Sequence, residues 1–381
     1  MHNGRPAVFI GSERCRTPSF GSNHPLAIPR VATVMDLCSA LGWLPSGTFR
    51  SSPSASVAEL CAFHDPDYVE ALRLADAAGR VEREVRERYA IGTSENPLFP
   101  GVFATAATAV GGSMLAAELA LDGFVSFHPA GGTHHGRSGR ASGFCYFNDP
   151  VFAIKRLGQR GLTRILYVDL DAHHGDGVQD AMQYDSRVHT ISVHESGRWP
   201  FTGLADDRGG GRSRNYPVPA GFGDTELEFL MDEAILPYAD SLRPEAVVIT
   251  CGTDALAQDP LSGLMLSNRA LWRAVGALIA TAPAAVVLGG GGYNPWTLAR
   301  CWTGLWGILS GREIPERLPS QARAILESLA CDLVDDDEIR PEWLTTLDDA
   351  PAEGPVRDAV RRLVVQSARR RHIGRQMSSC Q

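Results

Sequence analysis

Five ionisable side chains occur within eight residues, in the segment Asp169-Leu-Asp-Ala-His-His-Gly-Asp176. The segment completes an apolar run over 164–171, which is too short for a helix and is typical of a buried strand of a parallel sheet. Ligand sites of open α/β sheets lie just beyond the carboxyl ends of such strands. Burying this many ionisable groups is costly unless they are paired or hold a metal. A solvated acidic turn would not need the strand, so we expect a metal or catalytic site here.

Four other expected strands also end in polar side chains. These residues, in chain order, are His134 and His135, Ser192 and His194, Asp254, and Tyr293. Because parallel strands end at the same edge of a sheet, we expect these side chains to converge with the segment 169–176.

The residue types at this edge suit metal-assisted hydrolysis. Two carboxylates and one imidazole, from Asp171, Asp254 and His173, can hold a catalytic zinc that keeps an open position for water. Bound zinc lowers the pKa of that water from ~15.7 to about 7. The pair His134-His135 can take and return protons near neutral pH. Asp169 and Asp176 are candidates to orient these imidazoles.

The elements that would position these residues alternate along the chain. We expect strands at 7–11, 123–127, 164–171, 188–193, 245–251 and 284–288. We expect helices at 31–42, 67–90, 102–121, 149–160, 227–242 and 271–281, and a loop over 195–225. This alternation predicts an α/β fold, a single open parallel sheet covered by helices on both faces, with the site at the carboxyl ends of the strands.

The last part of the chain is expected to differ from the rest. After about residue 310 the strand–helix alternation weakens, and 356–372 is typical of a basic helix. We therefore predict a catalytic domain over 1–312. A mostly helical extension over 313–381 would be packed on that domain or flexibly attached to it.

Composition limits the function classes. The net charge of −8 gives no basic field for nucleic acid or an anionic membrane. Eight scattered cysteines favour reduced thiols in the cytoplasm, and we expect neither a signal peptide nor an apolar run of membrane-spanning length. Lys155 is the only lysine among 36 basic residues, a skew that hints at a GC-rich bacterial genome. We expect a cytoplasmic bacterial protein of unknown oligomeric state, with no nucleic-acid or membrane partner.

Four motifs give the chain a family resemblance. They are Phe127-His-Pro-Ala-Gly-Gly-Thr-His-His-Gly136, Ala141-Ser-Gly-Phe-Cys-Tyr-Phe-Asn-Asp149, Tyr167-Val-Asp-Leu-Asp-Ala-His-His-Gly-Asp-Gly177 and Leu288-Gly-Gly-Gly-Gly-Tyr-Asn294. In this order and spacing they resemble the zinc-dependent histone deacetylases, whose wider family includes acetoin-utilization proteins and acetylpolyamine amidohydrolases. The likeness runs from about His24 to Trp306 and implies an arginase/deacetylase-like fold.

The resemblance also implies roles for individual residues. Asp171, His173 and Asp254 match the zinc ligands, and His135 matches the general base and acid with His134 as its electrostatic neighbour. Asp169 and Asp176 match the carboxylates paired with His134 and His135, and Tyr293 matches the hydroxyl that stabilises the oxyanion. A structural potassium ion is implied near Asp169, Asp171, His173 and Ser192. The acyl-lysine channel is implied at Gly143, Phe144, Trp199, Leu261, Glu95 and Gly291, and the product path at Arg30.

Three departures from the family pattern concern the substrate. Trp199 stands in a shortened loop where an aromatic residue is common, which leaves acyl-chain preference open. Glu95 stands where an aspartate commonly grips the substrate backbone. Leu261 occupies the place where polyamine-selecting relatives carry an acidic residue, which weakly disfavours polyamines.

The residues of this site bear on several possible functions. The leading hypothesis is a zinc amidohydrolase that removes acetyl or other acyl groups from the ε-amine of lysine in proteins or peptides, through attack of zinc-bound water. Its alternative is a deacetylase of acetylpolyamines or other small N-acyl amines. A binuclear manganese ureohydrolase would need aspartates where Gly175 and Gly252 stand. A catalytically weak acyl-lysine-binding protein should have lost a zinc ligand, His135 or Tyr293, and none is lost.

Overall fold

Eight parallel strands form one sheet in the order β2-β1-β3-β8-β7-β4-β5-β6. This computed structural model describes residues 4–17, 19–21 and 24–367. The strands are β1 (Ala7–Gly11), β2 (Phe49–Ser51), β3 (Val125–His128), β4 (Ile165–Asp169), β5 (Val188–Glu195), β6 (Ser213–Val218), β7 (Ala246–Thr250) and β8 (Ala284–Leu288). The prediction of a single open parallel sheet is confirmed.

The register of the central strands aligns their carboxyl ends. Asp169, the last residue of β4, is paired with Thr250 of β7 and with Ser192 of β5. Thr250 is in turn paired with Leu288, the last residue of β8. Every residue of β4, β7 and β8 is buried, as expected for strands that are covered by helices on both faces. The loops that follow these strands therefore begin side by side.

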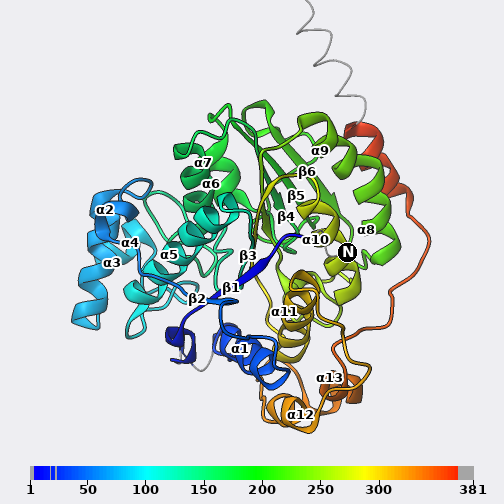
Figure 1. Cartoon of the computed structure of the whole chain (residues 1–381). Helices are drawn as coiled ribbons and strands as arrows, with labels where there is room; N and C mark the ends of the chain where they lie inside the picture. The colour runs from blue at the N-terminus through cyan, green and yellow to red at the C-terminus, as the bar shows by residue number, and fades with distance from the viewer. Residues whose placement is uncertain (1–3, 18, 22–23, 368–381) are drawn as a thin grey trace, which may run out of the picture.

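Helices cover both faces of this sheet (Figure 1). One hydrophobic core joins the sheet to α5 (Val102–Leu121), α6 (Asp149–Gln159) and α7 (Asp176–Met182). The other core joins it to α1 (Val31–Ala40), α8 (Asp224–Leu230), α10 (Asn268–Ile279) and α11 (Pro295–Leu309). Neighbouring residues of β4 belong to different cores, with Tyr167 in the first and Val168 in the second. Further α-helices are α2 (Val57–Leu60), α3 (Pro66–Ala78), α4 (Arg83–Tyr89), α9 (Leu236–Leu242), α12 (Ser320–Glu327) and α13 (Pro341–Thr345), and a π-helical turn, Met231–Ile235, joins α8 to α9.

Helix α5 corrects one expectation. Its 20 residues are long and apolar enough to cross a membrane by length and composition, although no such run was expected. More than half of its most apolar window is buried inside the protein, where the helix packs on α6, β3 and β8. A Cβ atom on Gly111 would lie 2.2 Å from the carbonyl oxygen of Pro53, so this glycine permits close packing in the middle of the helix. These contacts are those of a core helix.

Three further expectations about elements were wrong. The predicted helix over 67–90 is divided into α3 and α4, because Gly79 ends α3 in the left-handed conformation with a φ of 66°. The predicted loop over 195–225 contains β6, which pairs with β5 at the edge of the sheet. Its Pro217 is compatible with an edge strand, because one side of the strand needs no ladder hydrogen bond. The short edge strand β2 was not expected either.

The segment after α11 packs against that helix. Trp296 of α11 stacks on Trp343 of α13, with ring centroids 6.2 Å apart, and its indole N–H donates to the carbonyl of Leu326 in α12. Arg300 is fully buried and donates to Asp349 and to the backbone carbonyls of Thr346 and Asp348. A last described helix spans 358–367, whereas the rest of the predicted 356–372 helix lies outside the described residues. The division at residue 312 stays a prediction.

We predict that Arg300→Met lowers the free energy of unfolding by about 3 kcal/mol, because it leaves Asp349 and two backbone carbonyls without their cationic partner. Urea unfolding followed by circular dichroism measures this change. The matched control is Arg160→Met, which removes a solvent-exposed pair with Glu118 and should change stability little. Equal stability of the two variants would contradict a structural role for the contacts of Arg300.

Candidate active site

Side chains from four loops converge at the carboxyl edge of the sheet. The loop after β3 carries His134 and His135, and the loop after β4 carries Asp171 and His173. The loops after β7 and β8 carry Asp254 and Tyr293, respectively. All six side chains are buried, as are Asp169 at the end of β4 and Asp176 at the start of α7.

Asp171, His173 and Asp254 form a group that could hold a metal ion. One ligand atom from each residue lies within 4.8 Å of the others. Nδ1 of His173 is 2.9 Å from Oδ2 of Asp254 and 3.3 Å from Oδ1 of Asp171, so a single ring nitrogen faces two carboxylates. Two carboxylates and one imidazole are also the kind of donor set that suits zinc. The residues therefore fit the metal that their types predict.

The electrostatics of this group favour a cation at its centre. Burial and the neighbouring Asp171 raise the pKa of Asp254 above its usual range. Burial by itself lowers the pKa of His173, but the two carboxylates outweigh it and raise that pKa to about 10. The group thus concentrates negative charge away from water, which is stable only next to a positive partner.

Glycines allow the carboxylates to approach the neighbouring backbone. A Cβ atom on Gly252 would lie 2.1 Å from Oδ2 of Asp171, and one on Gly291 would lie 2.1 Å from Oδ2 of Asp254. Gly291 also donates its N–H to Asp171 at 2.6 Å. Gly291 therefore packs against two of the predicted metal ligands, and it is not among the residues that line the cavity containing His135, His173 and Tyr293.

The two adjacent histidines have different partners. Nδ1 of His134 donates to Asp169 at 2.7 Å, and Nδ1 of His135 donates to Asp176 at 2.8 Å, because a carboxylate can only accept. Burial lowers the pKa of His134, but Asp169 and Asp171 outweigh it and raise that pKa to about 9. Burial and the adjacent His134 lower the pKa of His135 to about 3. A neutral His135 with Nδ1 protonated keeps Nε2 available to accept a proton.

Residues that sequence reasoning missed support this pair. Asp149 is fully buried and accepts hydrogen bonds from the backbone N–H of Gly132, at 3.0 Å, and of Thr133, at 2.7 Å, which fixes the loop before His134. Arg137 pairs with Asp176 and so holds the carboxylate that orients His135. Asp149 is the last residue of the motif 141–149, and Arg137 directly follows the motif 127–136. Their positions beside these motifs are the sequence feature that could have indicated a role at the site.

A cavity of about 550 Å³ opens onto this cluster. It is lined by His135, His173 and Tyr293 together with Glu95, Gly143, Phe144, Trp199 and Leu261, all of which were candidates from the sequence. Four lining residues were not predicted, namely Glu195, the last residue of β5, and Gly197, Arg198 and Phe201, which flank Trp199 in the loop that follows. The ring centroids of Trp199 and His135 are 4.6 Å apart, and those of Phe144 and Tyr293 are 6.0 Å apart. Aromatic walls therefore lead to the polar cluster.

Arg30 and Ser192 do not line this cavity. Arg30 donates to the carbonyl of Gly290 and lines a separate cavity of about 170 Å³, which shares Phe144 with the first. Ser192 lies beside Asp169 in the register of the sheet, and its hydroxyl is 2.8 Å from Nδ1 of His194. The four residues of the predicted potassium site thus come from the end of β4, from the loop that follows it and from the position on β5 that pairs with Asp169.

Comparisons with known proteins agree with this geometry. Residues 24–309 match the histone deacetylase domain family. The chain is 35% identical over 331 residues to the acetoin utilization protein AcuC of Bacillus subtilis, covering 82% of this chain and 85% of that protein. It is 33% identical over 301 residues to histone deacetylase 8 of Xenopus tropicalis, covering 77% of this chain and 81% of that protein.

Solved structures give the same result. The crystal structure of a histone deacetylase homologue from Aquifex aeolicus superposes with a TM-score of 0.91 at 37% identity, covering 95% of this chain and all of that one. A complex of such a homologue with the compound SAHA superposes with a TM-score of 0.90. The resemblance inferred from the four motifs is thus confirmed, and the chain belongs to the histone deacetylase family.

Proposed function

We propose that this chain is a zinc-dependent deacylase that removes acetyl or other acyl groups from the ε-amine of lysine in proteins or peptides. The observation that carries the proposal is a single cavity that is lined by a candidate metal ligand, a histidine base and a tyrosine hydroxyl, His173, His135 and Tyr293. Hydrolysis of an amide needs an activated water molecule, a proton carrier and a donor for the oxyanion, and these side chains supply that set together with a metal.

Zinc held by Asp171, His173 and Asp254 would supply a Lewis acid that makes water acidic near neutral pH. His135 takes the proton of the attacking water on Nε2 while Asp176 holds its Nδ1. The Tyr293 hydroxyl donates to the oxyanion that develops as the carbonyl carbon becomes tetrahedral. His135 then returns the proton to the leaving nitrogen, which gives a carboxylic acid and a free amine. His134, paired with Asp169, adds positive charge beside this step.

The cavity walls support an alkyl amine as substrate. Phe144, Trp199 and Leu261 offer apolar surface to the methylene groups of a lysine side chain. Glu95, which is partly exposed, can accept a hydrogen bond from the substrate backbone at the same cavity. The second candidate substrate is a small N-acyl amine, and the similarity to the acetoin utilization protein supports this alternative. The apolar Leu261 gives a polyamine no counter-charge at this place.

We further propose a structural potassium ion near Asp169, Asp171, His173 and Ser192, product release past Arg30, and action in the bacterial cytoplasm. Arg30 lines the smaller cavity and contacts the loop after β8, next to the residues that would produce the acid. Its guanidinium would form charge-assisted hydrogen bonds with a carboxylate product in that cavity.

We predict that Tyr293→Phe lowers kcat for an acetyl-lysine peptide by about 100- to 1,000-fold, because the oxyanion loses its hydrogen-bond donor. Bound zinc, measured by atomic absorption, should stay the same because Tyr293 is not a ligand. The control Tyr184→Phe alters a tyrosine that is 87% exposed and should keep full turnover. Unchanged kcat in Tyr293→Phe would refute the oxyanion role.

A strong chelator should abolish turnover, and one equivalent of zinc added after the chelator is removed should restore it, because zinc would polarise the amide carbonyl and make water acidic at this site. Hydrolysis rates are compared before chelation, after it and after zinc addition. Turnover that persists after complete loss of metal would contradict zinc-dependent chemistry.

A panel of three zinc-loaded assays separates the substrate classes, with an acetyl-lysine peptide, a longer-chain acyl-lysine peptide and an acetylpolyamine. We expect kcat/KM to be highest for a peptide because Leu261 offers the polyamine no carboxylate. A higher kcat/KM for the acetylpolyamine would assign the protein to the second candidate function.

A further inference from the structure

One ion pair joins two segments of the cavity wall. Arg198 donates through Nε and Nη2 to the carboxylate of Glu195, and through Nη1 to the carbonyl of Leu261 at 2.9 Å. Glu195 also accepts the backbone N–H of Gly263 at 2.7 Å. The segment that carries Trp199 is thereby tied to the segment that carries Leu261.

Leu261 is also held from its other side. Its N–H donates to Asp259 at 2.9 Å, and the second carboxylate oxygen of Asp259 accepts the N–H of Tyr293 at 2.8 Å. Both backbone groups of Leu261 are therefore hydrogen-bonded to side chains, the carbonyl to Arg198 and the N–H to Asp259. A continuous series of hydrogen bonds runs from Arg198 through Leu261 to the tyrosine at the metal group, so that a shift in one wall is resisted by the others.

The pair has a geometry that few other residues could reproduce. Glu195 is only 7% exposed, and the guanidinium fork satisfies both of its oxygens while a third donor reaches Leu261. A lysine has one compact ammonium group and cannot match this planar arrangement. Because the two charges neutralise each other, the pair presents no net charge to a substrate.

We propose that Glu195 and Arg198 are specificity-determining residues that hold the space between Trp199 and Leu261 at the width of an unbranched alkyl chain. This inference rests on the proposed function, because the alkyl chain is the stem of the acylated amine. Glu195 and Arg198 act by positioning the two wall residues. Without the pair, Leu261 keeps the hydrogen bond from its N–H to Asp259 but loses the donor to its carbonyl, and the wall beside Trp199 can adjust to wider groups.

The test measures inhibitor binding to the zinc-loaded protein, which does not require turnover. The two probes are SAHA, whose hydroxamate follows an unbranched alkyl chain, and benzohydroxamic acid, whose ring adjoins the hydroxamate. In Arg198→Met we expect the affinity for SAHA to fall about five- to tenfold while that for benzohydroxamic acid holds or rises. The affinity ratio, which is the affinity for SAHA divided by that for benzohydroxamic acid, should fall less in Arg198→Lys than in Arg198→Met, because lysine keeps the charge but lacks the planar guanidinium.

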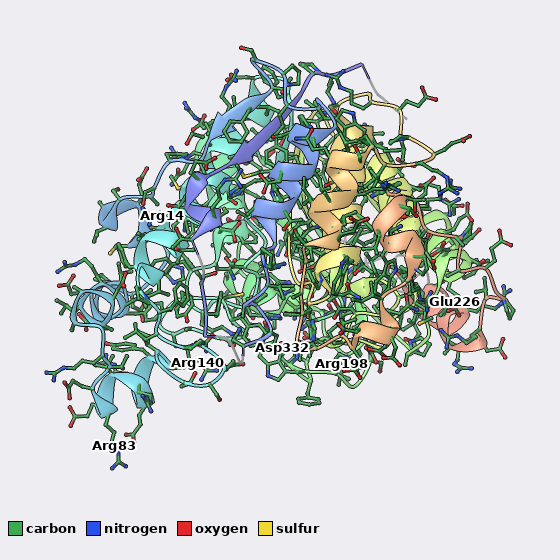
Figure 2. The ribbon with its side chains drawn as sticks, turned by 90° about the horizontal axis from the view of Figure 1, so that it is seen from below. Arg14, Arg83, Arg140, Arg198, Glu226 and Asp332 are labelled. Atoms are coloured by element: carbon green, nitrogen blue, oxygen red, sulfur yellow. The ribbon has the colours of Figure 1, made fainter. Side chains whose placement is uncertain are left out.

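A second ion pair provides a matched control. The guanidinium of Arg357 donates two hydrogen bonds of 2.8 and 2.6 Å to Glu226. The side-chain exposures of Arg357 and Glu226 are 38% and 5%, against 33% and 7% for Arg198 and Glu195. Arg357 donates to the carbonyl of Ala220 and not to that of Leu261, neither Glu226 nor Arg357 lines the cavity, and the labelled residues Glu226 and Arg198 lie apart in Figure 2. Arg357→Met should therefore leave the affinity ratio at its wild-type value.

An unchanged ratio in Arg198→Met, or an equal change in Arg357→Met, would overturn the inference. If Arg198→Met fails to fold, which circular dichroism detects, Arg198→Lys and Glu195→Gln decide by the same ratio. If the wild-type protein hydrolyses no acyl-lysine, but the variants show the expected changes in relative inhibitor affinity, the proposed function is contradicted and the positioning role is supported. Normal hydrolysis with unshifted ratios would contradict the positioning role alone.

Discussion

Two buried carboxylates that face one imidazole nitrogen are the interaction on which the rest of the site depends. Asp171 and Asp254 come from different strand ends, and each lies within 3.3 Å of Nδ1 of His173. Such a group is unfavourable in a protein interior unless a cation offsets its charge. The aligned ends of β4 and β7 bring the two carboxylates together, and the cores on both faces of the sheet keep those ends in register.

The carboxylates around that group hold different parts of the site in place. Asp169 holds His134 and raises its pKa, whereas burial and the adjacent His134 lower the pKa of His135, whose Nδ1 is held by Asp176. Asp259 and the Glu195–Arg198 pair act on the backbone of the cavity wall. Each of these carboxylates is buried and accepts hydrogen bonds from specific donors, so these groups stabilise the geometry of the site.

The sequence predicted those parts that depend on local pattern. The apolar run before Asp169 indicated a buried strand, and the polar residues at other strand ends indicated convergence at one edge. Edge strands β2 and β6 escaped prediction because they are stabilised mainly by pairing with β1 and β5, which no local pattern shows. The break between α3 and α4 depends on a single glycine within a strongly helical composition. The roles of Glu195 and Arg198 depend on contacts with residues more than 60 positions away, so spacing along the chain could not reveal them.

The most direct test of this account is urea unfolding of the wild-type protein titrated with zinc. If the buried group of Asp171, His173 and Asp254 is a metal site, the free energy of unfolding should rise with free zinc according to the linkage of binding to folding. The effect should correspond to one bound ion, and Asp254→Ala should lose most of it. Stability that does not respond to zinc, or that responds equally in Asp254→Ala, would contradict the central claim that this group is built around a metal ion.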